Sequence, residues 1–553
     1  MKNRRLLFLL LSLATVVLMS LPWLLPHCGW TALVGLAPLL MMERLATELK
    51  VKHFWWWHYG TFVAWNAVTT WWVCMATVGG GIFAVLANAL QMSLLFGSFR
   101  LVKRRLGGAL SYIYLAAAWL AWEKYYLTVA QISWPWLVLG NAFADTTSLV
   151  QWYSVLGHLG GSLWVWLANL GVFGLMVVLS DGRMAAWSGK TRVAAFAGAI
   201  AAVFGPMVWS LCLLGETPAE GQMDVVIGQP NLDPYEKFES LTQDQQDERL
   251  LSLLEPALPA EGPVLVLAPE TFTQGLILND MPENGTFRHL QAWLAEHPGA
   301  SVIFGASAYD RIVAAGSPHR LAYEGQEVMV DGQKRRIWYI SRNCAIATDT
   351  TGRWSLYHKS KLVVGVELTP YPAFFVPLEN ALLGGSVMGR CVGQDAPGVL
   401  KVRYGTETVP VGCAICYESV YGEYCTGYVR SGARLLTVIT NDAWWGNTAG
   451  YRQHLNYSRL RAIETRRWVA RCGNTGISAF ISPEGRIVSR TPWWEQAVLS
   501  GTVGLSSALT PFVRWGDLTG RIAVFLFGLL ALAALFRPRR QVSEPAASVP
   551  AAR

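Results

Sequence analysis

The chain has 553 residues, of which 52% are hydrophobic and 15% are charged. Soluble globular proteins carry about 25% charged residues, so this composition argues against a chain that is soluble throughout and indicates that part of it lies in lipid. The 26 tryptophans agree with this interpretation, because indole rings favour the membrane–water interface. The formal net charge of +8 does not indicate nucleic-acid binding, because the basic residues lie beside apolar segments, where membrane-orientation signals belong.

Apolar segments long enough for membrane helices lie mostly in the first 215 residues. A bilayer core takes about 20 apolar residues in a helix. The first apolar segment has a basic start but no clear small-residue cleavage site, so we expect it to be retained and not removed as a signal peptide. The predicted spans are 6–25, 29–46, 56–77, 80–98, 108–123, 161–180, 193–214 and 521–536.

Lys and Arg residues fall on alternate sides of these eight segments. They precede the first and follow the second, fourth, sixth and eighth, whereas the short loops between hold almost none. By the positive-inside rule, both termini are predicted to be cytoplasmic, and the insert after the seventh span faces the other side. The predicted domains are a seven-span membrane domain at 1–215, an extracytoplasmic domain at 220–510, a last span at 521–536 and a cytoplasmic, Ala/Pro/Ser-rich disordered tail at 537–553.

The insert at 220–510 has short apolar runs separated by polar and glycine-rich turns. Continuous apolar runs such as 264–267 and 435–439 are typical of buried strands. Helical patterns lie between some of them, at 287–296 and 453–469. Strands that alternate with helices predict an α/β layered domain whose sheets are covered on their faces.

Three segments that end strand-like runs carry residues suited to nucleophilic catalysis: Glu270, Lys359 and Cys416. Taken singly, each has a structural explanation as a solvated or ion-paired Glu, a surface Lys on a turn, or a small buried Cys. Their combination in one α/β domain is more informative. A thiol with an ordinary pKa near ~8.5 is a poor nucleophile at neutral pH, so it needs a base or a nearby cation.

The nine cysteines show no regular disulfide framework. Cys413 and Cys416 form a lone C-x-x-C, for which a redox role is a minor alternative. A zinc site would need a second pair or suitably spaced histidines. The chain also lacks a glycine-rich phosphate loop and a histidine cluster, so we expect no metal and no cofactor.

The order of these residues and the motifs around them resemble the nitrilase (carbon–nitrogen hydrolase) superfamily. Eight spans with an outward domain resemble its membrane branch, the apolipoprotein N-acyltransferases, and the resemblance covers nearly the whole chain. The matching segments are Pro269-Glu270-Thr271, Tyr357-His358-Lys359-Ser360-Lys361-Leu362-Val363, Cys416-Tyr417-Glu418, Asn441-Asp442-Ala443-Trp444-Trp445-Gly446 and Arg471-Cys472-Gly473-Asn474-Thr475-Gly476-Ile477-Ser478.

The resemblance implies a polytopic α-helical membrane domain joined to a four-layer αββα nitrilase-like domain, in a bacterial inner membrane. It implies transfer of a fatty acyl chain from a phospholipid to the N-terminal cysteine amine of a diacylglyceryl lipoprotein, through a thioester. In this scheme Cys416 is the nucleophile, Glu270 the base and Lys359 the oxyanion donor. Four further residues are implied to support the site or bind substrate: Glu367, Tyr417, Glu418 and Trp444.

Two stretches depart from the family pattern and put substrate fit near them in question. The family carries Pro-Phe-Gly-Glu after the lysine's Leu-Val, and this chain has Val364-Gly365-Val366-Glu367 there. An early Gln-Gly-Asn-like stretch reads Gly228-Gln229-Pro230-Asn231. The glutamate nevertheless keeps its place, eight residues past Lys359.

Two other functions are open at this stage. A membrane-anchored amidase or nitrilase would use the same three residues to hydrolyse a C–N bond, although one anchor would then suffice. A transporter or scaffold would carry polar groups in the middle of its spans, and few charges lie there. The apolar loop at 124–160, broken by Pro and Gly, is interpreted as an interfacial aromatic anchor, with a lip that guides lipid as the alternative.

Overall fold

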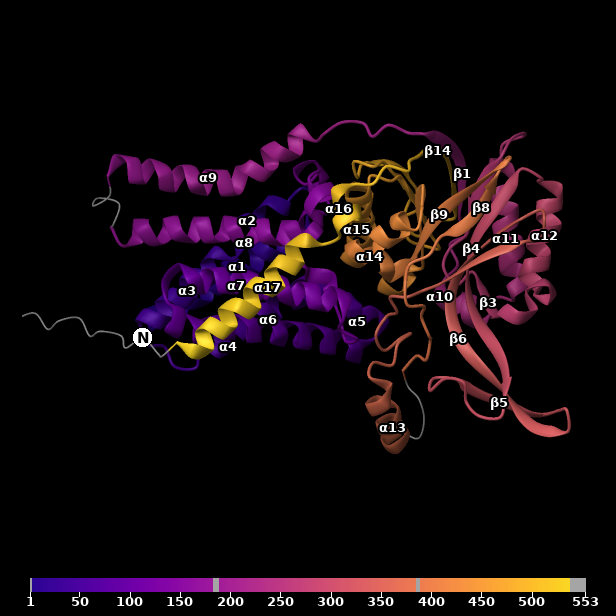
Figure 1. The fold of residues 1–553 in the computed structure, drawn as a ribbon, viewed down its shortest axis with the longest axis horizontal. Coiled ribbons are helices and arrows are strands. Elements are labelled where there is room, and N and C mark those ends of the chain that lie inside the picture. Colours follow the sequence, from indigo (N-terminus) through magenta and orange to yellow (C-terminus); the bar gives the residue numbers. More distant parts are fainter. Residues whose placement is uncertain (1, 183–187, 384–387, 538–553) are drawn as a thin grey trace, which may run out of the picture.

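The computed structural model describes residues 2–182, 188–383 and 388–537. A bundle of long helices forms one end of the molecule and a domain with two β-sheets forms the other (Figure 1). The helix α17, near the end of the chain, lies across the bundle formed by the first 215 residues and packs on α7. Most of the predicted tail at 537–553 lies outside the described residues.

The helical region is built from ten α-helices among the described residues. Five of them, α1, α6, α8, α9 and α17, are long and apolar enough to cross a membrane. The other three predicted spans, at 29–46, 56–77 and 108–123, fall on shorter or more polar helices, and their crossing of the bilayer stays a prediction. The helices are α1 Lys2–Leu24, α2 Ala32–Gly35, α3 Ala37–Glu48, α4 Trp55–Thr70, α5 Val73–Ala76, α6 Val78–Leu106, α7 Gly108–Thr128, α8 Tyr153–Ser180, α9 Gly189–Cys212 and α17 Leu518–Phe536.

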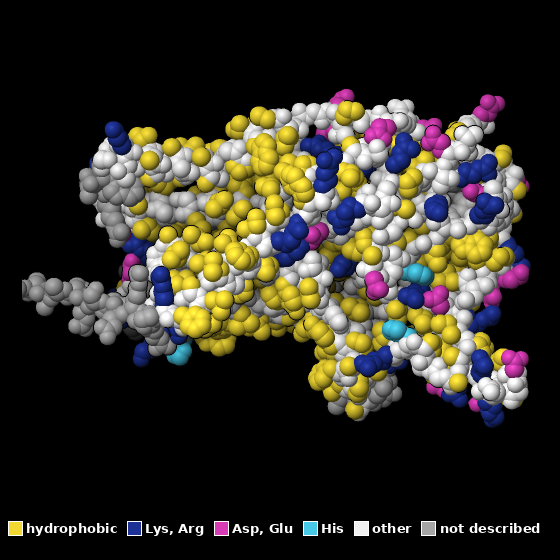
Figure 2. All heavy atoms as spheres, in the orientation of Figure 1, with side chains coloured by type: hydrophobic (Ala, Val, Ile, Leu, Met, Phe, Trp, Pro, Cys, Tyr) yellow, Lys and Arg dark blue, Asp and Glu magenta, His cyan; other side chains and the backbone are white. Residues whose placement is uncertain are grey.

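The surface of this region is apolar. Figure 2 shows hydrophobic side chains over the helices and most of the charged side chains over the sheet domain. Large residues such as Phe525 on α17 and Val193 on α9 are each 70% exposed. An exposed apolar surface of this extent is a surface for lipid.

The other domain contains two sheets. The first has the strand order β14-β1-β2-β4-β6-β5, with β3 on β4 and β7 on β6; the second has the order β13-β12-β11-β10-β9-β8. The strands of the first are β1 Gly221–Gln229, β2 Val264–Leu267, β3 Thr273–Ile277, β4 Ala300–Ala314, β5 Tyr323–Val330, β6 Gln333–Asp349, β7 Trp354–His358 and β14 Ala497–Leu505. Those of the second are β8 Leu400–Tyr404, β9 Glu407–Ile415, β10 Leu435–Thr440, β11 Val469–Gly473, β12 Ala479–Ile481 and β13 Ile487–Arg490.

Helices cover the outer faces of both sheets. On β2, Leu265 and Leu267 point into a core shared with the second sheet, whereas Val264 and Val266 pack on the outer side with α11 and α12. Alternate residues of one strand thus face two cores, which explains why the strands are apolar throughout. The predicted four-layer αββα fold is confirmed. The remaining α-helices are α10 Pro234–Glu239, α11 Gln243–Leu254, α12 Gly285–Glu296, α13 Pro372–Leu383, α14 Gly422–Arg430, α15 Ala449–Thr465 and α16 Pro511–Trp515.

Two expectations about local structure need adjustment. The helix predicted at 453–469 is α15, which ends at Thr465; Arg466 is left-handed with φ 50°, and Val469 already pairs with Leu436 in β11. The apolar start of β11 extends the apolar pattern past the end of the helix. The loop at 124–160 contains short 3-10 turns, as expected for a segment that does not span, but its Trp136 is fully buried and is no exposed anchor.

Candidate active site

The thiol of Cys416 is presented on a sharp turn at the end of β9. Ile415 is the last residue of the strand, and Cys416 begins the 3-10 helix η8 (Cys416–Val420) with φ 51°, in the left-handed region. A non-glycine residue in this region is strained, and such strain persists where surrounding contacts fix the backbone. A strained turn between a strand and a helix is also how nucleophile elbows expose their side chain.

Glu270 reaches the site from the end of β2. Its Oε1 accepts hydrogen bonds from Lys359 Nζ at 3.0 Å and Asn343 Nδ2 at 2.9 Å, and its Oε2 accepts one from the Asn441 backbone N–H at 3.1 Å. The Asn441 backbone lies at the end of β10, beside the nucleophile's own strand. The carboxylate is therefore buried but held in one orientation by three donors.

Lys359 follows β7 and lies between two carboxylates. Its Nζ is 3.0 Å from Glu270 Oε1 and 3.0 Å from Glu367 Oε1, and its side chain is 1% exposed. Burial alone would lower the pKa of Lys359, but the attraction of Glu270 and Glu367 outweighs it and raises that pKa well above the ordinary value. The ammonium is thus charged throughout the physiological pH range.

Glu367 is held in place although the residues before it depart from the family pattern. Its Oε2 accepts a hydrogen bond from the Val363 N–H at 2.8 Å, and its Oε1 accepts one from Asn343 at 2.6 Å. Gly365, with φ 83°, forms the turn that returns the chain to this position. The loss of Pro and Phe therefore leaves the contact between Glu367 and Lys359 intact.

The electrostatic environment keeps the Cys416 thiol neutral at rest. Burial and the negative charge of Glu270 raise the pKa of Cys416 well above its usual value, and the charge of Lys359 only partly opposes this shift. Since the thiolate is not preformed, attack by this sulfur needs a base that removes its proton during the reaction.

Glu418 ties the segment that carries Lys359 to the nucleophile turn. One carboxylate oxygen accepts hydrogen bonds from the Ser360 N–H at 2.7 Å and the Tyr357 hydroxyl at 2.7 Å; the other accepts from the Ile415 N–H at 2.8 Å and the Tyr428 hydroxyl at 2.9 Å. Glu418 is completely buried. Breaking this clamp would leave several buried donors unpaired, each at a cost of about 1–3 kcal/mol.

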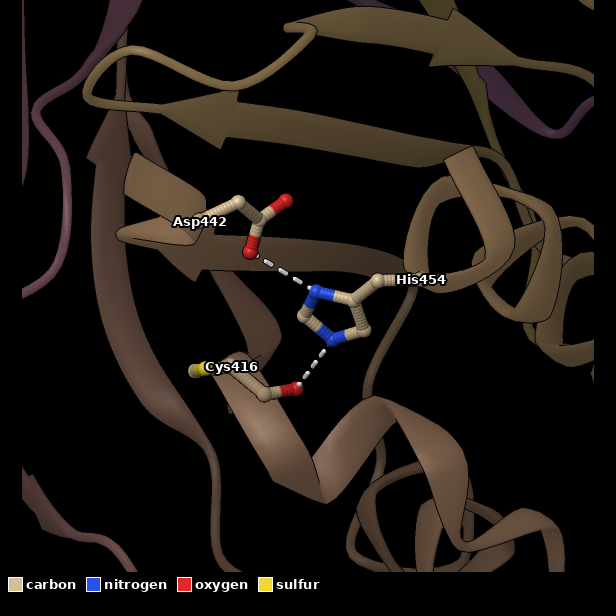
Figure 3. A group of neighbouring side chains, drawn as sticks. All are labelled: Cys416, Asp442 and His454. Carbon is tan, nitrogen blue, oxygen red and sulfur yellow. Dashed lines mark hydrogen bonds and ion pairs between the residues drawn. The ribbon is translucent and has the colours of Figure 1, made fainter. Parts of the chain in front are cut away.

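Behind the nucleophile, His454 of α15 holds the backbone of the turn and does not contact the sulfur through a hydrogen bond. Its Nδ1 is 2.9 Å from Asp442 Oδ1, and its Nε2 is 3.0 Å from the carbonyl oxygen of Cys416 (Figure 3). The sulfur points away from the imidazole in this view. Atoms of the three side chains lie within 4.8 Å of one another. Both ring nitrogens lie within hydrogen-bond distance of oxygen atoms, so His454 is suited to support the turn.

An aromatic wall links the nucleophile turn to the membrane helices. Tyr417 stacks on Trp134 with 6.4 Å between ring centroids, and Trp134 stacks on Trp136 at 5.2 Å. Trp136 in turn packs against Trp72, which follows α4, at 4.9 Å. The segment around Trp134 thus joins Tyr417 to the helical region.

Trp444 lies apart from this arrangement. It is 40% exposed in the 3-10 helix η9 (Asp442–Trp445), with its ring against Tyr235 at 6.3 Å. Its neighbour Trp445 packs inward, 4.8 Å from Trp72 and 5.5 Å from His454. Of the two tryptophans, Trp445 is the one that the structure brings to the nucleophile turn.

Sequence reasoning missed Asn343 and His454 as parts of the site. Asn343 lies within the long strand β6, and its amide donates to both Glu270 and Glu367. His454 lies twelve residues after Asp442, on the helix that follows. Asp442 itself belongs to a segment that the family resemblance had marked, and a search for its partner on the next helix could have found His454.

Comparisons with known proteins agree across both regions of the chain. The carbon-nitrogen hydrolase family model matches residues 219–509, more than half of the chain, and the model for the apolipoprotein N-acyltransferase N-terminal domain matches residues 15–171. The apolipoprotein N-acyltransferase of Chlorobaculum tepidum is 29% identical over 527 residues, covering 94% of each chain. That of Azotobacter vinelandii is 30% identical over 456 residues, covering 79% of this chain and 75% of the relative.

Among solved structures, a CN-hydrolase superfamily protein from Xanthomonas campestris is 16% identical, with a TM-score of 0.34 over 54% of this chain and 96% of that one. The two family models meet on one polypeptide, one on the helical region and the other on the αββα domain. Together with relatives that match along almost the entire length, they show that the chain belongs to the apolipoprotein N-acyltransferase family, within the carbon–nitrogen hydrolases.

Proposed function

We propose that this protein transfers a fatty acyl chain from a membrane phospholipid to the N-terminal cysteine amine of a diacylglyceryl lipoprotein, through a thioester on Cys416. The observation that carries the proposal is the buried ammonium of Lys359, fixed beside a neutral thiol and bonded to the carboxylate of Glu270. This arrangement offers a nucleophile, a base and a cation for a developing oxyanion. The adjoining apolar helices support the proposal, because lipid around them would lie near the site.

In the first half-reaction, Glu270 takes the proton of the Cys416 thiol as the sulfur attacks the ester carbonyl of the phospholipid. Lys359 stabilises the oxyanion that forms, a role whose loss typically costs about 10²–10³ in rate. The bond between the carbonyl carbon and the glycerol oxygen then breaks. Glu270 returns the proton to that oxygen, the lysophospholipid leaves, and the acyl chain remains on Cys416 as a thioester.

In the second half-reaction, the amine of the lipoprotein attacks the thioester carbonyl and Glu270 takes a proton from the amine. The C–S bond breaks, the amide product leaves, and the sulfur recovers a proton from Glu270. Water must be excluded between the two steps, since it would hydrolyse the thioester. The aromatic wall of Tyr417, Trp134 and Trp136, of which Tyr417 and Trp136 are buried, is suited to that exclusion.

The remaining candidate residues have supporting roles in this scheme. Glu367 holds Lys359 against Glu270, and Glu418 holds the Lys359 segment against the nucleophile turn. Tyr417 contributes to the aromatic wall. Trp444, which is exposed beside Tyr235, is proposed to contact substrate only outside the buried site, so its contribution is expected to be small.

The proposal includes an orientation in a bacterial inner membrane, with both termini in the cytoplasm and the αββα domain on the extracytoplasmic side. Basic residues such as Arg104 and Arg105 at the end of α6 support it, because Lys and Arg favour cytoplasmic loops. Labelling of single cysteines introduced in intact cells with a membrane-impermeant maleimide tests it. A cysteine at exposed Glu261 should react and one at Lys190 should not; the reverse pattern would contradict the orientation.

Mass spectrometry of the protein incubated with phospholipid vesicles tests the chemistry. We expect a fatty-acyl mass on the peptide that contains Cys416, released by hydroxylamine, and transfer of that mass to an added lipopeptide amine. Cys416→Ala should abolish it, whereas Cys413→Ala, which alters a buried thiol three residues away, should retain it. A free Cys416 thiol in the presence of donor, or the release of fatty acid and ammonia from amides in place of transfer, would overturn the proposal.

A further inference from the structure

A cavity of about 220 Å³ lies where the membrane helices meet the αββα domain, next to the candidate active site. The end of α7, the kinked start of α8 and the start of α17 contribute to its lining from the helical region. The first turn of α14 and the segment after Lys359 contribute from the other side. Figure 2 shows basic and acidic side chains gathered where α17 meets the domain, beside the apolar surface of the helices.

Lys361 brings a positive charge to this cavity. Its ammonium lies over the rings of Tyr421 and Tyr424, at 5.2 and 5.5 Å from their centroids. Among the residues that the structure describes, no carboxylate lies within ion-pair distance of it. Burial lowers the pKa of Lys361, although Glu418 and Glu423 attract its charge from farther away. An ammonium in this setting has capacity for an anionic partner.

His158 lines the same cavity and is 2% exposed. Its Nδ1 is 3.0 Å from Glu464 Oε1, and a carboxylate can only accept, so Nδ1 carries a hydrogen. Its Nε2 has no hydrogen-bond partner among the described residues. A buried ring nitrogen without a partner is costly. A phosphate oxygen can only accept, so it pairs with Nε2 in the ring form that carries a hydrogen on both nitrogens, with the Glu464 carboxylate beside Nδ1 as the counter-charge.

The start of α14 adds further donors. Gly422, Glu423 and Tyr424 form its first turn and line the cavity, and the first N–H groups of a helix lack partners within the helix. A Cβ on Gly422 would lie 2.6 Å from His158 Nδ1, so glycine allows the helix to begin against the histidine. The positive end of the helix dipole therefore faces the same space as Lys361 and His158.

The remaining charges of the lining leave an excess of one positive charge. Lys124 pairs with Glu423 and with Asp517, at 3.5 Å from Asp517 Oδ2. With Lys361 and Arg430 included, three cations stand against two carboxylates. A phosphodiester, which carries one negative charge, would balance the cavity.

We propose that this cavity binds the phosphodiester of a membrane glycerophospholipid, with Lys361, His158 and the first turn of α14 as its partners. The inference rests on the proposed function, since it makes the cavity the headgroup subsite of the acyl donor. Exposed apolar residues of α17, among them Leu518, Ile522 and Phe525, continue from the cavity along the helix and provide a surface for acyl chains.

The cavity is also connected to the catalytic residues. Tyr421 lines it and packs against Tyr417, the residue after the nucleophile, at 5.2 Å between ring centroids. Lys361 lies two residues after Lys359. A phosphate bound here would therefore place the glycerol esters of the same lipid toward Cys416.

The first test measures binding without turnover, in the full-length Cys416→Ser protein in detergent. The probes are dihexanoyl phosphatidylethanolamine, dihexanoylglycerol, which lacks the phosphate, and inorganic phosphate. We expect Lys361→Met to raise the Kd for the phospholipid about tenfold, since a hydrogen bond to a charged group is lost. Lys361→Arg should restore most of the affinity, and the Kd for dihexanoylglycerol should not change.

A matched control is Lys401→Met, which removes an exposed lysine on β8 and should leave all three affinities unchanged. Equal phospholipid affinity in Lys361→Met and the parent protein would overturn the inference. Inorganic phosphate that binds as tightly as the phospholipid would assign the cavity to free phosphate and would also overturn it.

The second test separates this inference from the proposed function. In the protein with Cys416 intact, Lys361→Met should raise the phospholipid concentration needed for half-maximal acylation of Cys416 about tenfold. The rate at which a preformed thioester passes to a lipopeptide amine should not change. If the unaltered protein is never acylated by phospholipid, the proposed function fails; if it is acylated and Lys361→Met behaves identically, only the headgroup subsite fails.

Discussion

Two charged clusters flank Cys416, and they differ in what they can do with a proton. The front cluster, defined as Glu270, Lys359 and Glu367, has two carboxylates around one ammonium. The rear cluster, defined as Asp442, His454 and Arg471, contacts the carbonyl oxygen of Cys416 through His454. The front cluster acts on the sulfur through charge and the rear cluster acts on the backbone.

The geometry of the rear cluster argues against a role as the base for the thiol. Burial would raise the pKa of Asp442, but His454 and Arg471 lower it to about 2. Both ring nitrogens of His454 lie within hydrogen-bond distance of oxygen atoms, those of Asp442 and of the Cys416 carbonyl, and not of the sulfur. A Cys, a His and an Asp that lie together could suggest a catalytic triad, yet here the base is expected in the front cluster.

The largest expected effect comes from removing the base of the front cluster. Glu270→Gln should reduce the rate of Cys416 acylation by about 10²–10⁴-fold, the usual range for a lost general base. The same substitution should make the thiol more acidic, because the negative charge of Glu270 raises the pKa of Cys416. Alkylation by iodoacetamide at pH 8 to 9 should therefore become faster while acyl transfer is lost.

The exposed Glu261 serves as the matched control, since Glu261→Gln should change neither rate. In the unaltered protein, the alkylation rate should keep rising with pH beyond the ordinary thiol range near ~8.5, because the pKa of Cys416 is raised. Slower alkylation in Glu270→Gln would contradict the conclusion that the charge of this carboxylate raises the pKa of Cys416.

A slightly smaller loss of acylation is expected when the cation of the front cluster, Lys359, is removed. Lys359→Met should reduce acylation about 10²–10³-fold, as for loss of an oxyanion donor. Here alkylation should become slower, because the positive charge of Lys359 opposes the rise in the Cys416 pKa. Opposite shifts in thiol reactivity, with loss of acyl transfer in both variants, would distinguish electrostatic roles from general damage to the fold.

The front cluster could be predicted from the sequence and most of its supports could not. Glu270, Lys359 and Cys416 each directly follow a strand-like apolar run, and residues after neighbouring strands meet at one edge of the domain. Asn343 lies within β6, where nothing in the local pattern distinguishes it from other polar strand residues. The clamp of Glu418 depends on hydroxyls of Tyr357 and Tyr428 that only the fold brings together.

The fold, like the site, was predictable from the sequence in some parts and not in others. Apolar length and basic flanks predicted the long helices, and continuous apolar runs predicted the buried strands of a layered domain. The position of the segment around Trp134 was not predictable, because its burial depends on contacts with Trp72 and Tyr417 from distant parts of the chain. The local sequence pattern is sufficient to predict a single helix or strand. A site at the junction of two domains can be predicted only when the relative positions of the two domains are known.

Substitution of His454 in the rear cluster should reduce the acylation rate moderately, because it alters the position of the nucleophile turn and not the charge beside the sulfur. His454→Ala should slow acylation by roughly 10-fold to 10²-fold, since a small misplacement of a reacting group is costly. His454→Gln should recover part of the rate, because an amide N–H can still donate to the Cys416 carbonyl. The pH dependence of Cys416 alkylation should be similar in both variants.

His289→Asn, which changes a half-exposed histidine on α12, is the control for this pair and should leave acylation unchanged. Loss of acylation as large as that of Glu270→Gln, with no recovery in His454→Gln, would instead make His454 the base. The rear cluster would then supply the base, and the front cluster would have only a supporting role.

The smallest effect is expected at Trp444, which belongs to the same short helix as Asp442 but points outward. Its side chain is 40% exposed and its ring packs on Tyr235. Trp444→Ala should change the acylation rate by less than about threefold, as is usual for surface positions away from buried contacts. Trp445→Ala, its matched neighbour, should cost considerably more, because that ring packs against Trp72 and His454. Steady-state acylation by phospholipid at several concentrations measures both effects. A large rise in the half-saturating phospholipid concentration for Trp444→Ala alone would make the exposed ring a contact of the acyl donor and extend the site to this surface.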